Sequence, residues 1–64
     1  MMESSFQTFT NFTFKDYFIV ISLQNNQLYR IDVYNKNYEL YAYAEDINYI
    51  ILHTTIQYLL PIQL

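Results

Sequence analysis

The sequence predicts an α+β domain in which a three- or four-stranded antiparallel meander is followed by one C-terminal helix. Up to Glu45 and Asp46 the apolar residues mostly alternate, as in half-buried strands, and after this pair they recur at helical spacing. Glycine is absent and Pro61 is the only proline. The turns must therefore be made by Asn and Asp, which tolerate left-handed backbone best after glycine.

Four strand-length segments rich in aromatic and β-branched residues occupy the first 45 residues, as expected for a pleated surface. The predicted strands are about 7–14, 17–23, 27–34 and 38–44. The turns between them fall at Lys15-Asp16, Asn25-Asn26 and Asn35-Lys36-Asn37. Connections this short make antiparallel hairpins. The first strand is the least regular, because the spacing of its phenylalanines changes midway.

The turn positions predict the register of the sheet. A two-residue turn at Asn25-Asn26 places Phe18, Val20 and Ser22 on the same face as Tyr29, Ile31 and Val33. A turn at Lys36-Asn37 extends this face through Leu40, Ala42 and Ala44. A turn one residue earlier would set Asp32 opposite Glu39, a destabilising like-charge pair.

The second face of the predicted sheet is also largely apolar and carries four of the eight tyrosines. It holds Tyr17, Ile19, Ile21, Leu23, Leu28, Arg30, Asp32, Tyr34, Glu39, Tyr41 and Tyr43. One helix can cover only one face of so small a sheet. An uncovered aromatic face would exceed the apolar patch that monomers normally expose, so it marks a contact surface.

Residues 47–60 are predicted to be helical, with Asp46 as the N-cap and Pro61 marking the end. Two apolar stripes lie on opposite sides of this helix. One is Ile47, Ile50, Ile51, Thr54 and Tyr58, and the other is Tyr49, Leu52, Ile56 and Leu59. One stripe would pack on the sheet, and the other would lie under the first strand or form a helix-to-helix dimer interface, which we assign to Tyr49, Leu52, Ile56 and Leu59. In the alternative, all-β fold, the β-branched residues of this segment form a fifth strand.

At 64 residues the chain is a single domain over 1–64, and its core is too small to give a wide margin of stability. Small domains usually add disulfides, a metal or a second subunit. There is no cysteine and only one histidine, so we expect a homodimer or a permanent protein partner.

The formal net charge of −3 opposes binding to phosphates, so neither nucleic acid nor an anionic membrane is an expected partner. The first residues lack the pattern of a secretory signal, and no stretch reaches the length of a membrane span. A soluble, cytoplasmic protein is expected.

No residues form a catalytic motif, and we expect neither an enzyme nor a cofactor or metal site. His53 stands alone, and the adjacent carboxylates of Glu45 and Asp46 are explained by the start of a helix. Without glycine the chain can form neither a nucleophile elbow nor a phosphate-binding loop.

Tyrosines are the residues that point to a function. Tyrosine supplies a large, rigid contact area and is enriched in binding hot spots. We therefore predict partner binding through Tyr34, Tyr41 and Tyr43, together with Arg30, which lies opposite Tyr43 in the predicted register and within reach of a cation–π contact.

Richness in Ile, Asn, Tyr and Phe resembles proteins encoded by AT-rich genomes. A chain this short without a catalytic motif resembles the small inhibitors that viruses and phages use against host factors, anti-CRISPR proteins included. The resemblance implies a viral protein that acts in the host cytoplasm by binding a host protein. The rival hypothesis is a structural, self-assembling subunit whose aromatic face pairs with copies of itself.

Overall fold

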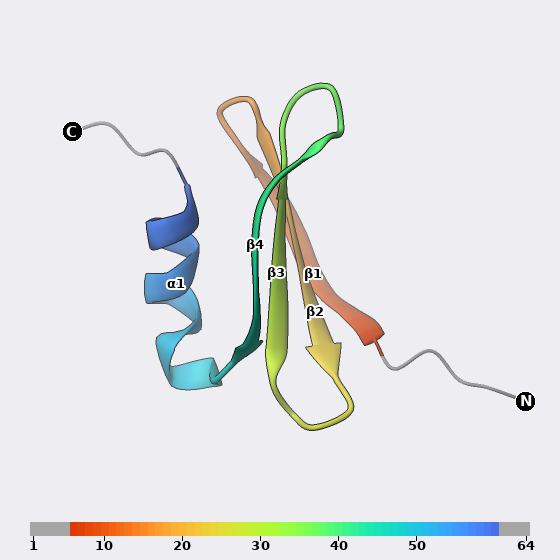
Figure 1. Cartoon of the computed structure of the whole chain (residues 1–64), viewed down its shortest axis with the longest axis vertical. Helices are drawn as coiled ribbons and strands as arrows, with labels where there is room; N and C mark the ends of the chain where they lie inside the picture. Colours follow the sequence, from red (N-terminus) through yellow and green to blue (C-terminus); the bar gives the residue numbers. More distant parts are fainter. Residues whose placement is uncertain (1–5, 61–64) are drawn as a thin grey trace, which may run out of the picture.

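The computed structural model describes residues 6–60 and confirms the α+β fold, with four antiparallel strands and a C-terminal helix. The strands are β1 (Phe6–Phe14), β2 (Tyr17–Gln24), β3 (Tyr29–Tyr34) and β4 (Leu40–Ile47), and they neighbour one another in chain order. A 3₁₀ helix, η1 (Tyr49–Ile51), leads into the helix α1 (Leu52–Leu59). Figure 1 shows α1 beside one face of the sheet. The alternative with a fifth strand is therefore wrong.

Two hairpin loops contain no glycine and instead have a glutamine or a tyrosine in the left-handed region of backbone conformation. Gln24 at the end of β2 donates its N–H to the Leu28 carbonyl oxygen at 2.8 Å, so this pair encloses a loop of three residues, 25–27. The last of them, Gln27, has φ 68° and donates its N–H to the Gln24 carbonyl oxygen at 3.0 Å. The β3–β4 loop repeats this arrangement with Tyr38, at φ 64°, donating to the Asn35 carbonyl oxygen at 2.9 Å. Three-residue loops that end in a left-handed residue are common hairpin connections. Each loop is one residue longer than the sequence predicts.

The longer β2–β3 loop changes the register between these strands, and the predicted register is wrong here. Ile19 pairs with Val33 and Ile21 with Ile31, because a slip of one residue moves every side chain of one strand to the other face. Phe18, Val20 and Ser22 consequently share a face with Arg30, Asp32 and Tyr34.

In the β3–β4 pair, Ile31 and Val33 share a face with Ala44 and Ala42, as predicted. A bulge in β4 compensates for the longer loop. Tyr41 is the extra residue, since Leu40 pairs with Tyr34 and Ala42 with Val33. The predicted position of Leu40 on the face of Ala42 is therefore wrong.

Two further irregularities shape the outer strands. In β1 a bulge between Thr8 and Thr10 leaves Phe9 without a partner on β2, which accounts for the change of phase among the phenylalanines. In β4, Asp46 adopts φ 60° and its backbone N–H donates to Gln24 Oε1 at 3.3 Å.

The helical segment begins at Tyr49 with η1, whose cap is Asn48 and not the predicted Asp46, and α1 itself follows Ile51 without a side-chain cap. Asn48 Oδ1 accepts a hydrogen bond from the Ile50 N–H at 2.8 Å, whereas Asp46 lies within β4. The helix ends at Leu59, and Leu60 is extended, with ψ 144°. The proline predicted to end the helix, Pro61, lies outside the described residues, but a following proline disfavours helical backbone at Leu60.

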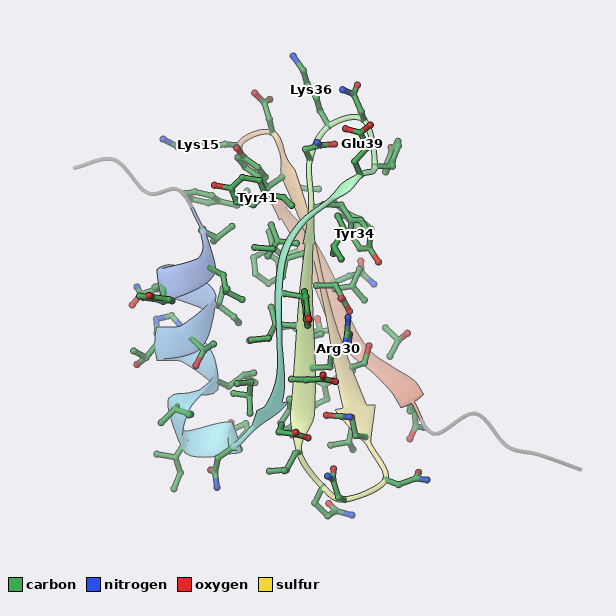
Figure 2. The ribbon with its side chains drawn as sticks, viewed as in Figure 1. Lys15, Arg30, Tyr34, Lys36, Glu39 and Tyr41 are labelled. Carbon is green, nitrogen blue, oxygen red and sulfur yellow. The ribbon has the colours of Figure 1, made fainter. Side chains whose placement is uncertain are left out.

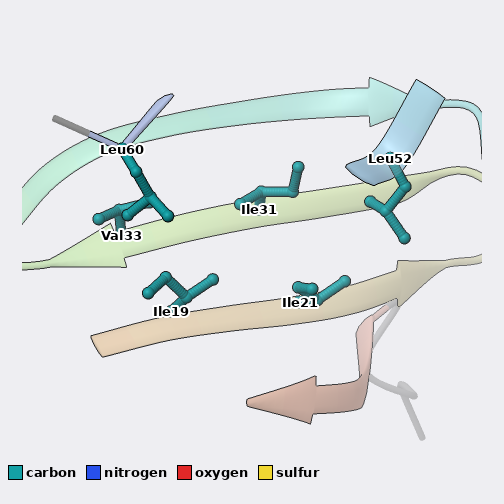
Figure 3. Close-up of a cluster of buried hydrophobic side chains, with 6 residues drawn as sticks. All are labelled: Ile19, Ile21, Ile31, Val33, Leu52 and Leu60. Carbon is teal, nitrogen blue, oxygen red and sulfur yellow. The ribbon is translucent and has the colours of Figure 1, made fainter. Parts of the chain in front are cut away.

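The core lies between α1 and the inner face of the sheet, and six aliphatic side chains from β2, β3 and the helical end form it. They are Ile19, Ile21, Ile31, Val33, Leu52 and Leu60. Figure 3 shows Leu52 and Leu60 closing over the four strand residues from opposite ends. Because α1 packs on β3 and β4 of this inner face, the opposite face receives no cover from residues 6–60.

Candidate interaction surface

The sheet face turned away from α1 is called the open face below. It consists of Thr8, Asn11, Thr13, Phe18, Val20, Ser22, Arg30, Asp32, Tyr34, Leu40, Tyr43 and Glu45. Figure 2 shows Arg30 and Tyr34 on this side of the sheet. Aromatic and aliphatic side chains thus surround a small group of charges.

Arg30 is fixed at the centre of the open face by two carboxylates. Its Nε donates to Asp32 Oδ1 at 3.0 Å, and its Nη1 donates to Glu45 Oε1 at 3.1 Å. The hydrogen bond that Arg30 donates to Asp32 is the main cause that raises the pKa of Arg30, against an opposing effect of burial. Asp32 is buried although it is charged, which is tolerated because the carboxylate is paired.

Tyr43 lies over this ion group, with its ring centroid 4.7 Å from the Arg30 guanidinium carbon. The predicted contact is therefore confirmed, although the residue directly opposite Tyr43 is Asp32. About half of Tyr43, 52%, is exposed. Arg30 is anchored by Asp32 and Glu45, so the Tyr43 ring rests against a positioned guanidinium while half of the residue stays exposed.

The other predicted binding tyrosines separate onto the two faces. Tyr34 lies on the open face, where its ring centroid is 6.4 Å from that of Phe18. Tyr41 instead contacts Tyr17, with ring centroids 5.0 Å apart, and Tyr17 packs against the core. Figure 2 places Tyr41 on the side of the sheet that faces α1. Alternation with Ala42 and Ala44 predicts a common face for Tyr41 and Tyr43, and the β4 bulge breaks that alternation.

The stripe assigned to a dimer interface lies mostly against the protein's own sheet. Leu52 is 7% exposed and belongs to the core, and Ile56 and Leu59 pack against it. Tyr49 alone of the four projects into solvent. An interface along this stripe would require three of its residues to leave the sheet.

The opposite predicted stripe is exposed except for Ile47, which belongs to β4 and packs against the core. Ile50 is 83% exposed and Tyr58 is 87% exposed, although both are large apolar residues. Beside the start of the helix lies a groove of about 450 Å³. Its lining consists of Phe9, Tyr49, Ile50, Leu52, His53 and Ile56. Sequence periodicity identifies both stripes, but it does not show which of them packs on the sheet.

His53 is exposed at the rim of this groove, among apolar residues. Within residues 6–60, no three side chains of the types His, Cys, Asp and Glu gather closely enough to hold a metal ion.

A second hollow, of about 390 Å³, lies between the β1–β2 and β3–β4 hairpin tips. Lys15 and Lys36 both line it, and Figure 2 shows them at the two tips. Asp16 lines the same hollow, and its carboxylate offsets part of the positive charge of the two lysines. The hollow is therefore not a concentrated positive site.

None of the helical segments within residues 6–60 has the length and apolar character needed to cross a membrane. Comparison of the chain with protein families, with curated proteins and with solved structures finds no match.

Proposed function

We propose that the protein is a small, non-enzymatic interaction module that binds a protein partner through the open face. One observation carries this proposal: Tyr43 is half exposed, yet Arg30 holds its ring, and Asp32 and Glu45 hold Arg30. A contact residue that is already ordered loses little conformational freedom on binding. Tyr and Arg are also the residue types most enriched in binding hot spots.

The chemistry of the open face indicates the kind of partner that fits it. The Arg30 charge is satisfied within the face by Asp32 and Glu45, and the surrounding side chains of Phe18 and Leu40 are apolar. The matching partner surface is therefore apolar, with polar groups at its rim. We expect the affinity to depend only weakly on salt between low and physiological ionic strength.

The resemblance in size and composition extends the proposal to viral and phage inhibitors of host factors, of the anti-CRISPR kind. Such an inhibitor needs a contact surface and no chemistry of its own, and the open face would supply that surface. The competing function is a self-assembling structural subunit, and the exposed Ile50 and Tyr58 favour it. Mass measurement in solution separates the two, because a subunit of this kind forms a ladder of sizes that grows with concentration.

The test compares proteins captured from lysate of the native host by immobilised parent, Tyr43→Ala, Tyr34→Ala and Tyr58→Ala chains. Tyr58 is the matched control, because it is a more exposed tyrosine in α1, which lies beside the other face of the sheet (Figure 1). A protein captured by the parent and the control should be lost with Tyr43→Ala, and its purified form should bind at least about tenfold more weakly, since truncating a hot-spot tyrosine costs about 2 kcal/mol.

Circular dichroism of each variant must match that of the parent, so that loss of binding is not loss of fold. The proposal is wrong if every protein captured by the parent is retained by Tyr43→Ala and Tyr34→Ala. It is also wrong if Tyr58→Ala alone abolishes capture, because the binding surface would then be the helix.

A further inference from the structure

The outer edge of β1 is the next feature of the sheet to consider. β1 stands at one end of the strand order, and no part of residues 6–60 pairs with its outer side. An edge strand presents a row of backbone N–H and C=O groups that can pair with another strand. Proteins normally blunt such edges with charged residues, proline, bulges or a covering element.

The two edges of this sheet differ in these devices. β4 carries Glu45 and Asp46, has an irregular register at two places, and has α1 packed on its inner face. β1 has no charged residue and no proline along nine residues, and its one bulge lies near its start, so Thr10–Phe14 pairs regularly with β2. The sheet therefore has one protected edge and one unprotected edge.

The side chains of β1 also leave apolar surface at this edge. Phe12 lies opposite Ile19 and so faces the same side as the core, yet it is 39% exposed because α1 packs on β3 and β4. Phe9 contacts Tyr29 on that side, with ring centroids 5.2 Å apart, and is half exposed. An added strand would bring further side chains beside both rings.

We propose that a second copy of the chain pairs with this edge, β1 against β1 and antiparallel, to form a continuous eight-stranded sheet with twofold symmetry. Identical uncharged strands meet without like-charge repulsion, and the twofold axis brings the exposed phenylalanines of both copies to the same side of the sheet. Antiparallel pairing sets the charged Lys15 of one copy beside the uncharged start of β1 in the other, whereas parallel pairing would set Lys15 beside Lys15.

Pairing of this kind closes on itself. The β1 edges of the two copies pair with each other, and the remaining edges, formed by β4, are protected. No further copy can therefore add to the sheet. The result is a dimer with both open faces exposed, which fits the need of so small a domain for added stability.

Charge placed on the edge tests the proposal. We expect the parent to sediment as a dimer and Asn11→Lys/Thr13→Lys to dissociate at least about tenfold more readily, because the four added positive charges repel one another across the junction. Both positions are exposed, so the fold should survive. The matched control is Thr54→Lys/Gln57→Lys, which adds the same charge at exposed positions of α1 and should remain dimeric.

Since the chain contains no cysteine, single cysteines locate the contact directly. At least one of Thr10→Cys, Asn11→Cys and Phe12→Cys should form a disulfide-linked dimer at least about tenfold faster than Gln57→Cys, because a residue near the twofold axis faces its own copy. A monomeric parent, a dimer unaffected by Asn11→Lys/Thr13→Lys, or dissociation by the helix variant alone would overturn the proposal.

Discussion

Truncation of Leu52 separates its role as a core residue from a role at an interface. The side chain is 7% exposed and closes one end of the core over Ile21 and Ile31 (Figure 3). Leu52→Ala removes three carbon groups, which is about 2.4 kcal/mol at about 0.8 kcal/mol per buried group. The residue lies at the rim of the core, where α1 can settle into the space, so we expect a total loss of about 2.5–3 kcal/mol, at the lower end of such substitutions.

That loss is a large part of the stability of a 64-residue domain, which is about 3–10 kcal/mol. The melting temperature should fall by about 10–20 °C. Urea unfolding followed by circular dichroism measures the change, with Ile50→Ala as the control because Ile50 is 83% exposed and should cost about 0.5 kcal/mol or less.

Oligomeric mass decides between the two roles of Leu52. If Leu52 is a core residue, Leu52→Ala lowers the free energy of unfolding by the same amount at two protein concentrations tenfold apart. The mass of the protein in solution then stays unchanged. Equal losses for Leu52→Ala and Ile50→Ala would refute the packing described here. A smaller mass for a Leu52→Ala chain that remains folded would restore the helix stripe as an interface.

Two further predictions concern a turn and the histidine. Gln27→Gly should raise the free energy of unfolding by about 0.5–1 kcal/mol, because glycine adopts φ 68° without the steric cost that glutamine has there. Asn25→Gly in the same loop is the control and should not raise the free energy of unfolding. A Gln27→Gly chain that is less stable than the parent would contradict this prediction. His53→Gln should fold and bind the captured partner as the parent does, because His53 is an exposed residue at the rim of a groove. A tenfold weaker affinity with the circular dichroism spectrum intact would show that His53 has a role.

The positions of the elements could be predicted from the sequence because they depend on local patterns. Alternation and helical spacing predict four strands and a helix, and the polar pairs predict the turns. The strand faces could not be predicted, since they depend on loop lengths that differ by one residue. In most proteins glycine would mark a left-handed loop position, but here Gln27 and Tyr38 occupy it, and neither residue type signals this conformation.

The same limit explains which candidate site residues the structure brings together. Arg30, Tyr34 and Tyr43 are on the open face because β3 and the central part of β4 keep their predicted faces. Tyr41 is separated from them by a bulge that alternation cannot reveal, and Phe18 joins them only through the shifted β2 register. Both helix stripes can be recognised in the sequence, but only the packing in the structure shows that Leu52 is buried against the sheet and Ile50 is exposed.

The most direct test of the proposed function is tyrosine nitration of the complex with the captured partner, read by mass spectrometry. Tyr43 on the open face and Tyr58 in α1 are both exposed in the protein alone, so both should react without partner. With partner bound, the modification of Tyr43 should fall at least about tenfold while that of Tyr58 stays unchanged, because a hot-spot residue is fully desolvated in the complex. Protection of Tyr58 with Tyr43 still reactive would contradict binding through the open face.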